Sequence, residues 1–234
     1  MTKIIDFDKG KFILEDVKCM LGGRLIEDYK HLEVARKYSM MHGNKPLVKP
    51  YYLWIEDTEK ENQFIPSFGL MCNIQKVMFE ALRNFYFHNA AEEFLLNFMS
   101  GIPLAHNTLV SLNIGGIANY AHGKDIIFSS GRDKKVLYFK KNNLKGMSLE
   151  RAIKNEESFI RNITLLDEPE ILIKIGNYFN MTSNLVFDWP AKKELDGQYF
   201  TVTIGAKIRA GGYNLVPYLG MTDRMGAISV KQIP

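Results

Sequence analysis

Residues 199–210 alternate between apolar and polar side chains, and this alternation constrains the fold more than any other stretch of the chain. One side of the alternation holds Phe200, Val202, Ile204, Ala206, Ile208 and Ala210. The other side holds Thr201, Thr203, Lys207 and Arg209. Because successive side chains of a strand point to opposite faces of its sheet, the pattern predicts a strand with one buried and one solvated face.

Further segments rich in β-branched and aromatic residues also predict strands. They are residues 108–114, 125–130, 136–141, 170–175 and 184–189. A short polar link containing Gly131 joins two of these segments, 125–130 and 136–141. We therefore expect those two to form an antiparallel hairpin.

Helical periodicity is expected mainly in the first hundred residues. Residues 24–41 contain neither proline nor glycine and place Leu25, Tyr29, Leu32 and Ala35 on one stripe. Apolar residues recur at three and four positions over 73–99, which predicts a long helix with a break near Asn89. A third helix is expected to begin at Ser148, whose hydroxyl can cap the free backbone amides.

These elements predict an α+β fold with a helical N-terminal half and a mostly antiparallel β-sheet in the C-terminal half. A length of 234 residues fits one domain. If that domain divides into lobes, we expect a helix-rich lobe over 1–103 and a strand-rich lobe over 104–234. The boundary then falls at 101–106.

Composition and motifs point to a location inside the cell. Cys19 and Cys72 show no disulfide framework and no C-x-x-C pair, and no two of the five histidines have the i, i+4 spacing of a helical metal pair. No apolar run reaches the length needed to cross a bilayer, and the first residues lack the apolar core of a signal peptide. We expect a cytoplasmic protein, in the host cytoplasm if its source is viral, with no metal, cofactor or membrane partner.

Positive charge is concentrated in residues 124–145, although the formal net charge of the whole chain is only +4. The cations there are Lys124, Arg132, Lys134, Lys135, Lys140, Lys141 and Lys145. Two acids oppose them, and Tyr138 and Phe139 lie between the lysines. Cations for phosphates and rings for bases are the combination that single-stranded nucleic acids require. The alternative is a solvated hairpin whose lysines discourage edge-to-edge pairing of sheets.

Tyr38, His42 and Lys45 surround a loop punctuated by glycine and proline, with Lys49 following. A phenol, an imidazole and an ammonium together can cleave RNA without a metal ion, by supplying a base, an acid and a cation for the phosphorane. If the protein is an enzyme, a metal-independent endoribonuclease is the first hypothesis. The alternative is an ordinary polar loop.

Residues 112–119, with the sequence LNIGGIAN, follow a predicted strand and carry the glycine pair Gly115 and Gly116. The stretch is similar to one in the anhydro-sugar kinases of the actin-like ATPase superfamily. That resemblance implies a small-molecule enzyme with a phosphate-binding turn. The alternative is a bend between two strands.

Residues 215–230 join two apolar runs through Gly220, Arg224 and Gly226. The glycines and the following AISV are similar to part of the C-terminal glycine-rich loop of the ferredoxin-like CRISPR RNA-binding and RNA-processing proteins. Tyr218 and Ile228 stand where the fuller pattern has glycines. The segment is therefore either the last turn of a β-sheet or a phosphate-holding loop in which Arg224 binds the anion.

Together these features predict a protein that binds RNA or single-stranded DNA, within a ribonucleoprotein or CRISPR-type complex. The expected contact residues are the cations of 124–145 with Tyr138, and Arg224. The alternative is a structural or assembly subunit of a virus, phage or large complex, which forms a homo- or hetero-oligomer through its aromatic residues.

Overall fold

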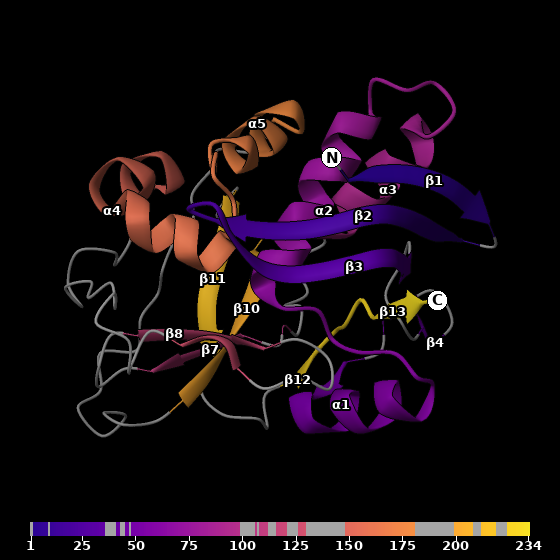
Figure 1. Ribbon diagram of the computed structural model, residues 1–234, viewed down its shortest axis with the longest axis horizontal. Helices are drawn as coiled ribbons and strands as arrows, with labels where there is room; N and C mark the ends of the chain where they lie inside the picture. The colour runs from indigo at the N-terminus through magenta and orange to yellow at the C-terminus, as the bar shows by residue number, and fades with distance from the viewer. Residues whose placement is uncertain are drawn as a thin grey trace.

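Three strands come first in the chain, and helices and further strands follow them. This is seen in a computed structural model. The residues that it describes are 2–8, 10–35, 41–42, 45–46, 48–98, 106, 108–111, 116–120, 126–129, 148–180, 199–207, 212–218 and 224–234. The strands are β1 (Lys3–Asp8), β2 (Lys11–Leu21), β3 (Arg24–Ala35), β4 (Met41–His42), β5 (Lys45–Pro46), β6 (Lys49–Pro50), β7 (Thr108–Ser111), β8 (Gly116–Tyr120), β9 (Ile126–Ser129), β10 (Tyr199–Lys207), β11 (Gly212–Tyr218), β12 (Arg224–Met225) and β13 (Val230–Ile233). The helices are α1 (Tyr51–Lys60), α2 (Phe68–Ala81), α3 (His88–Phe98), α4 (Leu149–Thr164) and α5 (Ile171–Tyr178) (Figure 1).

The first sheet is an antiparallel meander of β1, β2 and β3, with β13 added beside β3. Gly22 and Gly23 form the two-residue connection between β2 and β3, and their φ angles are 55° and 79°. Positive φ at both positions is what a type I′ hairpin turn requires, and glycine adopts it without strain. Phe64 closes the outer side of β13 by exchanging two backbone hydrogen bonds with Val230 (2.8 and 3.0 Å).

The expected order, with helices in the N-terminal half and the sheet in the C-terminal half, is wrong. Residues 24–35 of the stretch expected to be helical form β3, paired with β2 on one side and β13 on the other. Tyr29 and Leu32 are both buried although three positions separate them, which imitates the spacing of a helix. The strand is nevertheless favoured because its backbone groups pair with β2 from Arg24 to Ala35 and also with β13 over 31–34.

An irregularity in the sheet produces this spacing. Asp16 of β2 has a left-handed φ of 53°. On β2 the buried residues are Phe12 and Leu14 before that point and Val17 and Cys19 after it, so the buried face changes phase. β3 lies opposite and changes phase as well, which interrupts the strict alternation that identifies a strand in a sequence.

α2 and α3 confirm helices within the pattern expected over 73–99. The break lies earlier than expected, at 82–87, and Asn89 is part of α3. α2 begins earlier than its apolar pattern indicated, because Ser67 caps it through its hydroxyl group.

The helix expected from Ser148 is confirmed as α4, and the Ser148 hydroxyl accepts a hydrogen bond from the Arg151 amide at 3.2 Å. The strand expected over 170–175 is wrong, because these residues form most of α5. In the helix Leu172 and Ile175 both enter the core, and α5 contacts α2. This packing overrides the β propensity of the isoleucines.

The second sheet has the order β11-β10-β7-β8-β9, and each of its described pairs is antiparallel. β7, β9 and β10 confirm strands within the segments expected at 108–114, 125–130 and 199–210. The segments 136–141 and 184–189 lie outside the described residues, so the hairpin expected between 125–130 and 136–141 stays a prediction. β8 is the described neighbour of β9.

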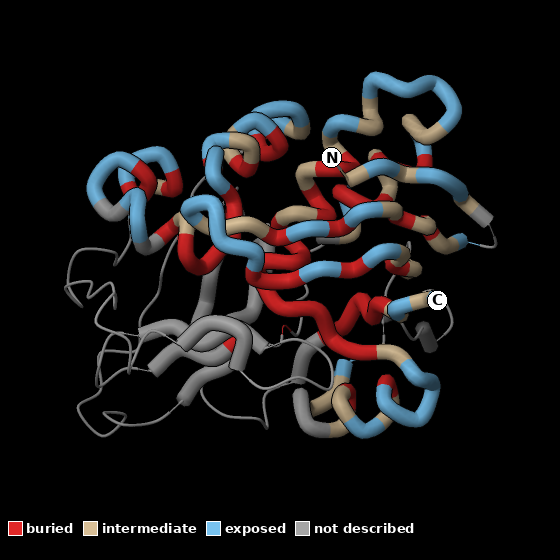
Figure 2. The backbone as a smooth tube through the Cα atoms, viewed as in Figure 1, coloured by how far each residue is buried: buried red, intermediate tan, exposed pale blue. Residues whose placement is uncertain are grey.

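α2 lies between the sheets, since it contacts β1 and β2 of the first sheet and β10 of the second. It also contacts α3, α4 and α5 (Figure 1). Phe12 of β2 meets Phe94 of α3 edge to face, with ring centroids 6.0 Å apart. The buried residues concentrate where these elements meet (Figure 2). A division into lobes at 101–106 stays a prediction, because that segment lies outside the described residues except for His106.

Candidate nucleic-acid interface

A short antiparallel ladder joins β6 to β12. Arg224 lies opposite Pro50, and Met225 lies opposite Lys49. The two strands come from distant parts of the sequence, and the ladder places β12 directly beside the start of α1 (Figure 1). Arg224, expected to bind an anion, is thereby brought to the strand that leads into this helix.

The backbone just before β6 folds back on itself. β4 pairs with β5, so His42 lies opposite Lys45 and Met41 lies opposite Pro46. Two of the three residues considered for RNA cleavage are therefore paired across this ladder, whereas Tyr38 lies outside the described residues. We call these two ladders, 41–42 with 45–46 and 49–50 with 224–225, the basic ladder surface.

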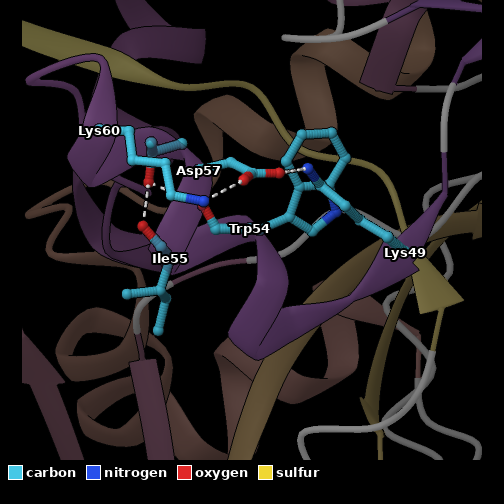
Figure 3. A network of polar contacts seen from close by, with 6 residues as sticks. Lys49, Trp54, Ile55, Asp57 and Lys60 are labelled. Atoms are coloured by element: carbon cyan, nitrogen blue, oxygen red, sulfur yellow. Dashed lines mark hydrogen bonds and ion pairs between the residues drawn. The ribbon is translucent and has the colours of Figure 1, made fainter.

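A network centred on Asp57 holds β6 against α1 (Figure 3). The Lys49 ammonium pairs with the Asp57 carboxylate and lies 4.0 Å from the centre of the Trp54 ring. Lys60 donates to the same carboxylate at 3.2 Å. Hydrogen bonds from Lys49 and then Lys60 lower the pKa of Asp57 below its usual value. Because the Lys49 side chain is only 12% exposed, its contacts serve to hold the two elements together.

The start of α1 adds positive potential to the basic ladder surface. Its N-cap is Pro50, no side chain caps the helix, and its first turn carries no acidic residue. The amide end of a helix bears a partial positive charge that favours anions. The β6–β12 ladder thus places the backbone of Arg224 beside the end of a helix dipole, and the β4–β5 ladder that contains Lys45 precedes β6 in the chain.

The sequence around this surface is basic over a longer range. Residues 36–55 contain Arg36, Lys37, Lys45 and Lys49 and neither aspartate nor glutamate. The sequence pattern marked Tyr38, His42 and Lys45 in this stretch for RNA cleavage, but it did not mark the stretch for phosphate binding, because the lysines of 124–145 are closer together. An acid-free run of this length is the signal that identifies it.

The other expected contact residues fall outside the described residues. They are Lys124, Arg132, Lys134, Lys135, Tyr138, Lys140, Lys141 and Lys145. Their role in binding stays a prediction from the sequence.

The segment 215–230 does not turn within one sheet. β11 pairs with β10 in the second sheet, whereas β13 pairs with β3 in the first. The chain therefore crosses between the sheets here, and β12 is the point at which the crossing meets β6. Residues 219–223, which include Gly220, lie outside the described residues.

A second polar centre is buried at the start of α2. The Ser67 hydroxyl donates to the Glu27 carboxylate and accepts from the Leu70 amide at 3.0 Å. The Tyr29 hydroxyl donates to the same carboxylate at 3.1 Å, and burial raises the pKa of Tyr29. Ser67 has no exposed surface and Glu27 is 2% exposed, so this centre ties β3 to α2.

His106 is also fully buried, with its ring edge to face against Phe68 (5.6 Å between centroids). Burial lowers its pKa to about 3, an effect that the backbone of Pro66 opposes more weakly. The imidazole is therefore neutral at physiological pH, as an interior position favours.

Within the described residues, no group of three or more histidine, cysteine, aspartate and glutamate side chains is placed to hold a metal ion. Among the described helices, none has both the length and the apolar character needed to cross a membrane. Comparison of this chain with protein-family models, curated proteins and solved structures finds no match.

Proposed function

We propose that this protein binds RNA or single-stranded DNA, with phosphates held at the basic ladder surface. The observation that carries the proposal is the pairing of β12 with β6, which brings Arg224 to an acid-free, lysine-containing segment at the amide end of α1. Cations and helix amides from distant parts of a chain gathered in one place favour a polyanion. The lysines of 124–145 add further phosphate contacts in this proposal.

The test measures binding of labelled oligonucleotides of about 15 nucleotides at about 50 and about 200 mM salt. The probes are single-stranded RNA, single-stranded DNA and a DNA duplex of the same sequence. We expect the single strands to bind most tightly. The double variant Lys45→Glu/Arg224→Glu is expected to bind them about tenfold more weakly, with a shallower salt dependence.

Lys154→Glu/Lys174→Glu is the matched control, because it makes the same change of charge at exposed positions of α4 and α5. It is expected to bind within about twofold of the wild type. Equal losses in both double variants would mean that only net charge matters and would remove the basic ladder surface from the proposal. Absence of binding by the wild type would remove the function itself.

The proposal also includes the cellular compartment in which the protein acts. Cys19 and Cys72 are free, buried thiols, which suits the reducing cytoplasm, of a host cell if the source is viral. The resemblance of residues 215–230 to CRISPR RNA-binding proteins favours a ribonucleoprotein complex.

The proposal also includes metal-independent cleavage of RNA by Tyr38, His42 and Lys45. If the protein cleaves RNA, we expect oligonucleotide fragments to form in the presence of a metal chelator. The His42→Ala variant should not form them.

A second candidate function is that of an assembly subunit, and one observation favours it. Phe85 is 100% exposed and Tyr86 is 75% exposed, a costly arrangement unless the rings meet a partner. A stable oligomer on a sizing column without nucleic acid would support this reading.

A further inference from the structure

The connection between α2 and α3 presents two aromatic side chains to solvent. It spans residues 82–87, here called the aromatic turn, and contains the exposed rings of Phe85 and Tyr86. Figure 2 shows this connection as one of the exposed parts of the backbone. Such large apolar surfaces are normally buried, so their exposure requires an explanation.

Hydrogen bonds fix the backbone that carries these rings. The Asn84 side chain accepts from the Tyr86 amide at 2.9 Å, and the Asn84 carbonyl accepts from the amides of Phe87 (3.1 Å) and His88 (2.9 Å). The His88 ring nitrogen Nδ1 lies 2.6 Å from the Leu82 carbonyl oxygen. A turn held in this way presents its rings without a large ordering cost on binding.

The rings border a hollow of about 580 Å³. Its lining residues are Leu82, Arg83, Phe85, Tyr86, His88 and Asn89. None of them carries a carboxylate, and Arg83 is exposed beside the rings. A cation next to stacking faces complements a nucleotide, which combines a phosphate with a base.

We propose that the aromatic turn is a base-stacking subsite for single-stranded nucleic acid, in which Phe85 and Tyr86 stack on bases and Arg83 contacts a phosphate. This inference rests on the proposed function and deepens it, because it predicts preference for strands whose bases are unpaired. A second copy of the chain fits less well. Four rings of about 200 Å² each bury roughly 800 Å², less than the 1,200 Å² or so of a stable dimer.

The test separates bases from phosphates by using two probes of the same length. One is an oligothymidylate of about 15 nucleotides, and the other is an abasic sugar–phosphate oligomer with the same number of phosphates. Loss of one stacked base is expected to lower affinity for the oligothymidylate roughly 5- to 150-fold, so Phe85→Ala/Tyr86→Ala, which removes both rings, should lose at least that much. Its affinity for the abasic oligomer is expected to stay within about twofold of the wild type.

The matched control is Ile5→Ala/Leu96→Ala, which truncates two other partly exposed apolar side chains (48% and 46% exposed). It is expected to bind both probes as the wild type does. Because Phe85 and Tyr86 are exposed, their double variant is expected to fold, which an unchanged melting temperature checks. Phe85→Trp is expected to retain affinity, with tryptophan emission quenched by the oligothymidylate and not by the abasic oligomer.

Each outcome supports or overturns the inference. If the Phe85→Ala/Tyr86→Ala variant binds oligothymidylate as tightly as the wild type while Lys45→Glu/Arg224→Glu binds both probes weakly, the stacking subsite is wrong and the proposed function stands. If the wild type binds neither probe, both are wrong. If the wild type self-associates without nucleic acid and the aromatic variant does not, the turn is a protein contact instead.

Discussion

Arg224 lies opposite Pro50 in an antiparallel ladder, although most of the chain separates the two residues. Pro50 is the N-cap of α1, so the chain that crosses between the two sheets is tied to the start of this helix. The ladder has consequences for stability as well as for binding, because Lys49 in the same strand is bound to α1 by its side chain.

Lys49→Met is expected to destabilise the protein by about 1 kcal/mol through loss of the cation–π contact with Trp54. Thermal and denaturant melts measure this loss. NMR titration should show the pKa of Asp57 rising toward its usual value, because Lys49 is the largest cause of its lowering. Lys60→Met is the control and should cost less, since the Lys60 side chain is 71% exposed. Equal melting temperatures of the two variants would contradict a special role of Lys49 in holding β6 against α1.

Gly69→Ala is expected to destabilise the fold by about 1 to 3 kcal/mol, the range for overpacking a core. A Cβ at this position would lie 2.4 Å from the Leu165 side-chain atoms Cγ and Cδ1. Leu165→Ala removes these two atoms at its own cost and leaves only the Leu165 Cβ, 2.8 Å from the added Cβ, so it relieves most of the clash. The double variant should therefore be more stable than the sum of the two single effects predicts, as urea melts can establish. If the two single losses of stability simply add in the double variant, α2 does not pack closely on Leu165.

Ser67→Ala is expected to cost about 2 kcal/mol, because it removes the α2 cap and one of the donors to the buried Glu27 carboxylate. Tyr29→Phe removes another donor without touching the cap. It should destabilise less, and denaturant melts of both variants test this ranking. The reverse ranking would assign the main role to the phenol rather than to the cap.

Stability should fall between pH 7 and pH 5, because of His106. Its pKa is about 3 in the folded protein, below the ordinary value of 6.5, so the unfolded chain binds the proton more readily over this interval. The stability present above the unfolded pKa is therefore lost as pH falls, by about 2 kcal/mol at pH 5. Urea melts at the two pH values measure the difference. His106→Gln should flatten this dependence, and an unchanged slope in the variant would assign the effect to other groups.

Local patterns in the sequence predict some elements and mislead for others, for physical reasons. Ser148 begins a helix through its own hydroxyl group, and β10 alternates strictly, so both can be predicted locally. β3 cannot be predicted locally, because its buried face changes opposite Asp16 and this puts the buried residues Tyr29 and Leu32 at a helical spacing. The glycine pair of the β2–β3 turn is the local signal that would have corrected this interpretation.

The candidate site depends even more on contacts that are distant in sequence. His42, Lys45 and Arg224 can be selected as chemically capable residues, but a two-residue strand such as β12 has no periodicity to predict its partner. The aromatic turn illustrates another limit. A phenylalanine beside an apolar helix is normally assigned to the core, and only the folded chain shows that Phe85 is fully exposed.

The pairing of β13 with β3 determines when the first sheet can be completed during synthesis. Val34 of β3 pairs with Val230, so a nascent chain that has made only the meander carries a β3 with one unpaired edge until residues 230–233 have left the ribosome. Contacts so distant along the chain also slow folding. Expression of fragments ending before residue 230 should therefore yield aggregation-prone material.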